Sequence, residues 1–379
     1  MDIMKKVFVC LFVVIWCCSF SLRASDTVRI REMQIPVLIE REDNVLFCFR
    51  IDATAGQVFN EIRLNFGKEV NLSAIQAVKL YYSGTRRLSD KEKNLIAPVE
   101  YISAHNPGKT LAANPSYSVL RALESKPRRE IVLKAEQELF EGPHFYWVSL
   151  QMKPKTSLFE KVTVSVSEVK VDGRRVPLFF HSERDIEHRM GVGVRHAGDD
   201  GSAAFRIPGL VTTNQGTLLG VYDVRYNNSA DLQEHIDIGL SRSTDGGKTW
   251  EKMRIPVSFG ETGGLPKGQN GVGDPAILVD TKTNCVWIVA AWTHGIGGQR
   301  AWTASGQGMD MNHTAQLVLA KSEDDGKTWS EPMNITEQLK DSSWYFLLQG
   351  PGRGICMEDG TLVFAMQYIG ADRIPNAGI

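Results

Sequence analysis

Runs that alternate between hydrophobic and polar residues fill the first half of the chain and predict β-strands. Lys161 to Val171 alternates between valine and polar residues, which is typical of a strand with one buried face. Val45 to Ile51 and Phe145 to Met152 are apolar and rich in residues that favour strands. Turn signals such as Asp172-Gly173 separate such runs. These patterns predict a β-sandwich over residues 25–182.

The N-terminal segment has the layout of a secretory signal peptide. Lys5 and Lys6 precede an apolar run from Val7 to Phe20, and a more polar stretch ends near Ala24. The run is short for a membrane span, although a retained anchor is the alternative. We therefore predict a signal peptide over residues 1–24 and no membrane span after its removal. The expected location is secreted, periplasmic or at the cell surface of a bacterial envelope.

A change in residue composition along the chain indicates a second domain. Residues 183–195 are charged and then glycine-rich, which indicates a linker, with a short helix possible from Glu183 to Met190. Beyond residue 196 a motif occurs twice, from Ser243 to Trp250 and from Ser322 to Trp329. The shared pattern is Ser-x-Asp-x-Gly-x-Thr-Trp. In a tight turn the aspartate can accept backbone N–H bonds, and the glycine can take a positive φ.

This motif resembles the Asp-box, or BNR repeat, of sialidases and related β-propellers. The resemblance implies that residues 196–379 are part of a six-bladed propeller, of which about two and a half blades are present. The predicted fold is therefore all-β, with an N-terminal sandwich followed by an incomplete propeller. Asp245 and Asp324 are assigned to the structure of their own turns and not to catalysis.

A second motif, Arg206-Ile207-Pro208, precedes the repeats and resembles the start of the first sialidase blade. The resemblance implies that Arg206 is one of three arginines that clamp the sugar carboxylate, which suits a planar guanidinium. It also implies that Arg225 contacts the substrate and that Asp231 is the acid/base carboxyl. Glu234 and His235 are nearby rivals for that role.

Further positions are candidates for binding the rest of the sugar. Asp274, in Gly271-Val272-Gly273-Asp274-Pro275, resembles a second-blade aspartate that faces O4 and the N-acetyl group. Trp292 and Trp302 flank a glycine-rich loop and are candidates for the N-acetyl pocket, although core packing suits Trp292 equally well. Gln349 is a candidate for contact with the glycerol tail. No residues have metal-ligand spacing, and no cofactor is expected.

The predicted function is an exo-α-sialidase, a glycoside hydrolase that releases terminal sialic acid from glycoconjugates with retention. The family's tyrosine nucleophile, its glutamate partner and two further clamp arginines are not assignable in this chain. We therefore expect this chain to be C-terminally truncated and inactive alone. The alternatives are a non-catalytic carbohydrate-binding or adhesion protein, a trans-sialidase, and an arabinan-type propeller glycosidase, against which Arg206 counts.

The composition of the chain limits the classes of partner that it is expected to bind. The net charge of the 379 residues is −1, and no basic excess suggests nucleic acid. The expected partners are sialylated glycans, and the sequence does not indicate an oligomeric state. Outside the signal segment the cysteines are Cys48, Cys285 and Cys356, too few and too widely spaced for a disulfide framework.

Overall fold

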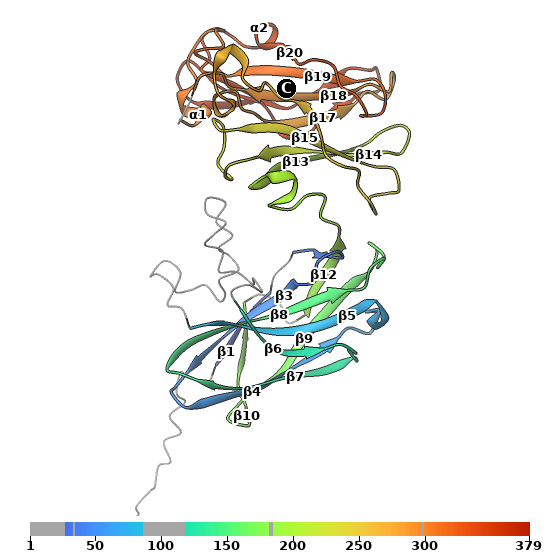
Figure 1. The fold of residues 1–379 in the computed structure, drawn as a ribbon, viewed down its shortest axis with the longest axis vertical. Coiled ribbons are helices and arrows are strands. Elements are labelled where there is room, and N and C mark those ends of the chain that lie inside the picture. Colours follow the sequence, from blue (N-terminus) through green and yellow to red (C-terminus); the bar gives the residue numbers. More distant parts are fainter. Residues whose placement is uncertain (1–26, 33–34, 86–117, 182–184, 297–298) are drawn as a thin grey trace, which may run out of the picture.

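The computed structural model describes residues 27–32, 35–85, 118–181, 185–296 and 299–379. The chain forms two β-rich parts that follow one another along the long axis of the molecule (Figure 1). The all-β expectation is confirmed, because the described helices are single short turns. The predicted signal peptide lies outside the described residues. Among the described helices, none has the length and apolarity needed to cross a membrane.

The N-terminal part consists of two sheets packed face to face. One has the strand order β11-β1-β3-β8-β5-β6, and the other has the order β2-β12-β9-β4-β7, with β10 beside β9. The strands are β1 (Val28–Glu32), β2 (Val37–Leu38), β3 (Asn44–Ala53), β4 (Gln57–Phe66), β5 (Ile75–Gly84), β6 (Val119–Glu124), β7 (Glu130–Leu139), β8 (Gly142–Met152), β9 (Lys161–Val171), β10 (Arg174–Arg175), β11 (Leu178–Phe180) and β12 (Asp185–Gly191).

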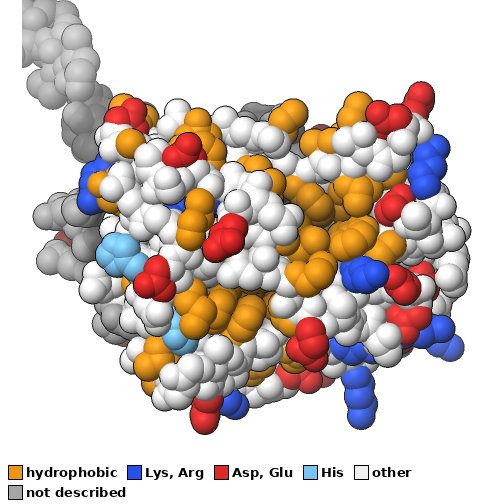
Figure 2. All heavy atoms as spheres, turned by 90° about the horizontal axis from the view of Figure 1, so that it is seen from above, with side chains coloured by type: hydrophobic (Ala, Val, Ile, Leu, Met, Phe, Trp, Pro, Cys, Tyr) orange, Lys and Arg blue, Asp and Glu red, His pale blue; other side chains and the backbone are white. Residues whose placement is uncertain are grey.

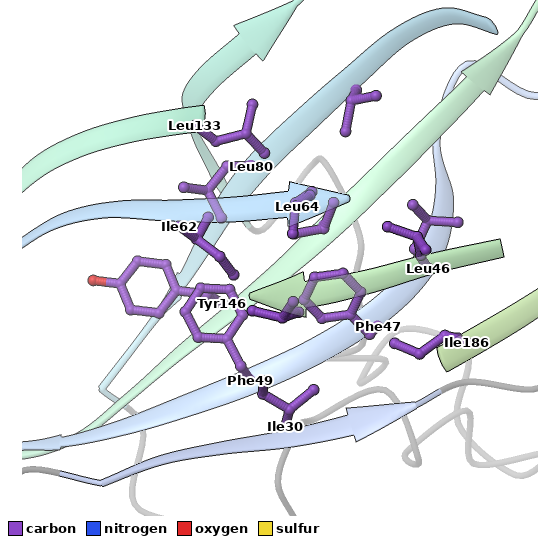
Figure 3. Close-up of a cluster of buried hydrophobic side chains, with 14 of the residues drawn as sticks. Ile30, Leu46, Phe47, Phe49, Ile62, Leu64, Leu80, Leu133, Tyr146 and Ile186 are labelled. Carbon is purple, nitrogen blue, oxygen red and sulfur yellow. The ribbon is translucent and has the colours of Figure 1, made fainter. Parts of the chain in front are cut away.

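The core of this sandwich comes from the inward-facing positions of both sheets (Figure 3). The valines of β9 are buried, as its alternating sequence predicts. At the centre Phe49 and Tyr146 stack with ring centroids 5.0 Å apart, and Phe59 meets Tyr146 edge-on. Aromatic pairs in these arrangements add to the free energy gained from burial alone.

The end of the sandwich corrects one expectation. The prediction of a possible short helix from Glu183 to Met190 is wrong, because Asp185–Gly191 forms strand β12. Ile186, His188 and Met190 alternate inward, and the strand pairs with β9. The period-two burial of these side chains outweighs the helical preference of the charged residues between them. The stretch predicted as a linker, 183–195, therefore includes a strand of the sandwich.

The C-terminal part contains two larger sheets. The first sheet has the order β13-β14-β15-β16, and the second has the order β20-β19-β18-β17-β22. Their strands are β13 (Ala204–Thr212), β14 (Leu218–Arg225), β15 (Ile236–Ser243), β16 (Arg254–Val257), β17 (Val272–Val279), β18 (Val286–Trp292), β19 (Gln316–Ser322), β20 (Met333–Asn334) and β22 (Gly352–Arg353). The smaller elements are α1 (Ala301–Ala304), α2 (Thr336–Leu339), β21 (Phe346–Gln349), β23 (Ile355–Cys356), β24 (Leu362–Val363), β25 (Met366–Ile369) and β26 (Pro375–Gly378).

The first and second sheets pack against each other through a shared apolar cluster that includes Leu219, Ile238, Ile277 and Ile288. The next, smaller sheet, β21-β25-β26, follows the second. Beside it lies an apolar cavity of about 230 Å³, lined by Trp287, Val289, Leu317, Leu319, Ile335, Leu339, Gln349, Leu362, Phe364 and Met366. Hydrophobic side chains also gather near the centre of the face seen in Figure 2.

The first strands of the two larger sheets share one irregularity. In β13 the pairing with β14 shifts between Arg206 and Gly209, and in β17 the pairing with β18 shifts between Gly273 and Ala276. Both bulges contain a residue with positive φ directly before a proline: Ile207 (φ 55°) and Asp274 (φ 56°). A bulge bends its strand and redirects the neighbouring side chain. The same device therefore recurs at the start of both sheets.

The two Asp-box motifs form turns that the side chains of the motif themselves hold together. Asp245 accepts hydrogen bonds from the backbone N–H groups of Lys248 and Thr249 and from the Thr249 hydroxyl. These bonds lower the pKa of Asp245 to about 2, and the bond from the Thr249 hydroxyl has the largest effect. Asp324 makes the equivalent bonds to Lys327 and Thr328. Both carboxylates are thus engaged inside their own turns.

The second motif also joins the two sheets. Asp325 stands where the first motif has Gly246, and its carboxylate lies 2.9 Å from the Arg242 guanidinium of β15 and 2.6 Å from the Thr217 hydroxyl. The Asp325 and Arg242 side chains are each 5% exposed. Arg242 also pairs with Glu251 through Nη1, but removal of Asp325 leaves the buried Nη2 group of Arg242 and the Thr217 hydroxyl without their acceptor, which is strongly destabilising.

We therefore predict that Asp325→Ala lowers the free energy of unfolding of the C-terminal part by about 3 kcal/mol. Urea unfolding followed by tryptophan fluorescence measures this loss. Glu323→Ala is the matched control, because the Glu323 side chain is 72% exposed, and its surface pairing contributes less than about 1 kcal/mol. Equal, small losses for both variants would show that the Asp325–Arg242 pair does not stabilise the packing of the sheets.

Candidate active site

Arg206 and Arg225 lie side by side at one end of the first sheet. Arg206 comes from the bulge in β13, and Arg225 is the last residue of β14. Both guanidinium groups donate to the backbone carbonyl of Ser229, each over 2.9 Å. They differ in accessibility, since the Arg206 side chain is 34% exposed and that of Arg225 is 1% exposed.

Asp231 joins the two arginines. Its Oδ1 atom accepts a hydrogen bond from Arg206 Nη1 over 2.9 Å and from Arg225 Nη1 over 2.8 Å. Burial raises the pKa of Asp231, but the hydrogen bonds and charges of Arg225 and Arg206 outweigh burial and hold this pKa below its usual value. The Asp231 side chain is nevertheless 54% exposed, so its carboxyl group is open to solvent.

Asp223 is a functional candidate that the sequence reasoning missed. It precedes Arg225 by two residues on β14, and therefore lies on the same face of the strand. Its Oδ2 atom accepts Arg225 Nη2 over 2.7 Å and Nε over 3.1 Å, and its Oδ1 atom accepts the backbone N–H of Asp274 over 2.8 Å. A charged pair on the buried face of a predicted strand is the sequence signal that identifies such a residue.

Asp274 completes the group from the second sheet. Its side chain lies near Asp223, and burial raises the pKa values of both carboxyls, that of Asp223 to about 7. The negative charge of Asp274 is the second cause for Asp223, and Arg225 opposes both.

The loop between β14 and β15 is tied to the second sheet by Gln233, another residue that the sequence reasoning missed. Gln233 Oε1 accepts the N–H of Gly271 and the hydroxyl of Thr293, and Gln233 Nε2 donates to the Thr293 carbonyl. The loop carries Asp231, and these bonds fix its far end. No pattern in the sequence marks this glutamine, because its partners come from another sheet.

Glu234 and His235, the rivals for the acid/base role, face other groups. Glu234 accepts hydrogen bonds from the side-chain amides of Asn227 and Asn228. His235 stacks on Tyr226 with ring centroids 4.1 Å apart. Neither residue has a described hydrogen bond to Arg206 or Arg225, whereas Asp231 is bonded to both.

The remaining candidate binding residues differ in how deeply their side chains are buried. Trp292 is buried and stacks on Phe259 at 4.1 Å, as the core-packing alternative anticipates. Trp302, in α1, is half-buried against Phe346. Gln349 is fully buried, and its amide donates to the backbone carbonyl of Asp274. The structure thus gathers Arg206, Arg225, Asp231 and Asp274, and places Gln349 behind Asp274. The substrate-binding roles of Trp292, Trp302 and Gln349 stay predictions.

A metal site is not evident. Across the described ranges no group of three or more histidine, cysteine, aspartate or glutamate side chains is placed to hold a metal ion. Two guanidinium groups beside an exposed carboxylate form a different kind of site. The guanidinium groups can bind a carboxylate-bearing ligand, and the carboxylate can exchange a proton with that ligand, as the cleavage of an acidic sugar requires.

Comparison with known proteins gives the family. Residues 25–175 match the N-terminal domain of BNR-repeat neuraminidase, and residues 207–374 match a BNR repeat-like domain. A sialidase of Bacteroides fragilis is 66% identical over 377 residues, which cover 99% of this chain and 69% of that protein. A sialidase of Clostridium perfringens is 32% identical over 196 residues, 50% of this chain and 48% of that protein.

The solved structure titled Hadza microbial sialidase Hz136 superimposes with a TM-score of 0.80 at 56% identity, covering 92% of this chain and 68% of that one. The fold and the matched sequences define a class of glycoside hydrolases. Within that class, the chain belongs to the sialidase family. It spans about two thirds of the length of its Bacteroides relative.

The Asp223–Asp274 pair yields a prediction about pH. A carboxyl whose pKa is raised on folding binds more protons in the folded than in the unfolded state, so its contribution to stability falls as pH rises. Asp274→Asn removes one charge and suits a positive φ. The free energy of unfolding of the variant should rise relative to that of the wild type between about pH 4 and 7. At pH 8 it should exceed the wild-type value by about 1 kcal/mol.

Urea unfolding at pH 5 and pH 8 measures this difference. Asp280→Asn is the control, because hydrogen bonds, first from the Thr283 hydroxyl, lower the pKa of Asp280. That substitution should give no gain at pH 8. A constant difference between Asp274→Asn and the wild type at both pH values would contradict the raised pKa of the pair.

Proposed function

We propose that this chain contributes the carboxylate clamp and the acid/base carboxyl of an exo-α-sialidase, which releases terminal sialic acid from glycoconjugates with retention. The single observation that carries the proposal is the contact of Arg206 and Arg225 with the same oxygen of Asp231. Sialic acid bears a carboxylate on its anomeric carbon. A clamp for that carboxylate next to a proton donor therefore places the donor beside the glycosidic oxygen.

Each side chain has a role in this proposal. Arg206 binds the sugar carboxylate, and Arg225 contacts the substrate through the Nη1 group that now faces Asp231. Asp231 protonates the leaving oxygen and later removes a proton from the attacking water. Asp274 faces the O4 and N-acetyl side of the sugar, and the half-buried Trp302 is available for the N-acetyl group.

The sheets of the C-terminal part support a more specific proposal about the fold. We propose that the first and second sheets are the first two blades of a six-bladed propeller. The repeated Asp-box turns, the repeated bulges in β13 and β17 and the match to a BNR repeat-like domain support this reading. The hydrophobic side chains around the cavity beside β21 and β25 suit contact with a further blade.

We also propose that the protein is exported, so that it meets sialylated glycans outside the cytoplasm. The two lysines and the apolar run of residues 7–20 support this proposal. N-terminal sequencing of the protein recovered from its native host tests it. A mature N-terminus near residue 25 is expected, and a protein that retains Met1 would contradict removal of a signal peptide.

Binding of N-acetylneuraminic acid to the chain is the direct test of the clamp. We predict that Arg206→Met weakens binding at pH 6 at least tenfold, because a charge-assisted hydrogen bond contributes about 1.5–3 kcal/mol. Isothermal titration calorimetry measures the affinity. Arg254→Met is the matched control, because Arg254 pairs with Glu251 and not with Asp231. The methyl ester of the sugar should bind weakly to the wild type, since it carries no charge on its carboxyl group.

A fluorogenic sialoside tests turnover separately. We expect residues 25–379 to bind the sugar without robust hydrolysis, because Tyr222 and Tyr226 bond Ser241 and Asp237 instead of a glutamate. Rapid hydrolysis would contradict this expected inactivity and support the function. Equal binding of the acid and its methyl ester would contradict the proposed function itself.

A further inference from the structure

A surface groove of about 420 Å³ lies between the edges of the first and second sheets of the C-terminal part. One wall comes from β16, the edge strand of the first sheet, and from Ser258 just after it. The other wall is the segment from Lys327 to Pro332, which leads from the second Asp-box turn to the edge strand β20. The volume lies within the range of sites that bind small molecules, and no lining residue belongs to the candidate active site.

Trp329 gives this groove an apolar surface that the protein holds in place. Its ring packs against the shared apolar cluster of the two sheets, and its Nε1–H group donates to the Gly326 carbonyl over 3.3 Å. Because the indole N–H already has a partner, Trp329 offers a ligand the hydrocarbon surface of a large, rigid ring. Trp250, its equivalent in the first motif, lies beside Gly220 of β14 instead.

Hydroxyl groups stand next to this apolar surface. Ser258 is exposed on one wall and Ser330 lies on the other. The Ser330 oxygen accepts the backbone N–H of Lys321 over 3.1 Å, so its own proton is available for donation. A ring with hydroxyl groups at its edge and C–H groups on its face matches such a combination, because one part needs hydrogen bonds and the other needs apolar contact.

The charges of the groove favour an uncharged ligand. Arg254 pairs with Glu251 over 2.8 Å, which neutralises the guanidinium and fixes its position. Lys327 and Glu331, the other two charged residues of the lining, are both exposed and have opposite signs. An anion in the groove would face Glu331, and a cation would face Lys327. Hydroxyl groups can bond both, because they donate as well as accept.

The strand β16 suits an extended peptide less well. A peptide that adds to the edge of a sheet needs an uninterrupted row of backbone N–H and C=O groups. Pro256 has no N–H group, and the pairing of β16 with β15 is irregular between Ile238 and Leu240. Proline on an edge strand discourages the addition of a further strand.

We propose that the groove between β16 and the second Asp-box turn is a secondary binding site for a neutral saccharide. The sugar ring contacts Trp329, and its hydroxyl groups bond the polar side chains of the two walls. This site goes beyond the proposed function, because it holds an uncharged part of a glycan and uses neither Arg206 nor Asp231. It keeps a glycan chain on the outer edge of the sheets, away from the arginines.

Saturation-transfer NMR with N-acetyllactosamine tests this site on the full chain. We expect transfer to the sugar protons and a dissociation constant of about 1 mM, as befits a small ligand with one aromatic contact. Trp329→Leu should weaken binding about tenfold, because the sugar loses the apolar surface on which it lies. Trp250→Leu is the matched control and should keep the wild-type affinity. Excess N-acetylneuraminic acid should leave the wild-type signal unchanged.

A second variant closes the groove without removing a packed side chain. Ser258→Trp places a large ring at an exposed position of the wall and should abolish the transfer. Lys248→Trp adds the same ring at an exposed position of the first motif and should leave the transfer unchanged. Thermal unfolding followed by circular dichroism checks that each variant is folded.

The possible outcomes separate this site from the clamp. No transfer in the wild type would overturn the proposal, and so would binding that persists in both Trp329→Leu and Ser258→Trp. Loss of the signal in excess N-acetylneuraminic acid would place the disaccharide at the arginines and would overturn it as well. Equal losses in Trp329→Leu and Trp250→Leu, with Ser258→Trp unaffected, would show that Trp329 only stabilises its turn. None of these results bears on the binding of the acidic sugar, which calorimetry measures separately.

Discussion

The site depends on the hydrogen bonds and ion pairs that surround the buried guanidinium group of Arg225. A charge that is 1% exposed is tolerated in a protein interior only when partners surround it. Here Asp223 holds one side of the guanidinium, and Asp231 with two loop carbonyls holds the other. Because Asp223 also binds the backbone of Asp274, one cation connects β14, the loop after it and the second sheet.

The bulges explain how two regular sheets deliver these groups to one place. In an unbroken strand, side chains alternate between the two faces at fixed spacing. The shifts in pairing after Arg206 and Gly273 interrupt that alternation at the start of each sheet. Gly209 follows the first bulge, and a Cβ atom there would collide with the backbone of Gly352. The Arg-Ile-Pro-Gly sequence is therefore both a turn of the strand and a point of close packing.

The sequence was informative where the signal is local. The alternating valines of β9 and the two Asp-box turns follow from spacing and turn chemistry, and the family resemblance pointed to Arg206, Arg225 and Asp231. Signals that depend on distant partners were lost. Asp223 and Gln233 have meaning only beside the second sheet, and Asp325 only beside Arg242. The sequence of strand β12 also permits a helix, because its alternation is short and carries charged residues on its outer face.

An excess of carboxyls over arginines favours a hydrolase over a protein that only binds glycans. A binding protein gains affinity from arginines that no other anion occupies, since each internal carboxylate competes with the ligand. A catalyst gains instead from interactions that strengthen as the reaction proceeds. Asp231 is bonded to Arg206 and Arg225 and is nevertheless 54% exposed, so a carboxylate open to solvent stands beside both cations. An internal carboxylate at that place costs a glycan-binding protein affinity, whereas a hydrolase can use it as a general acid and base.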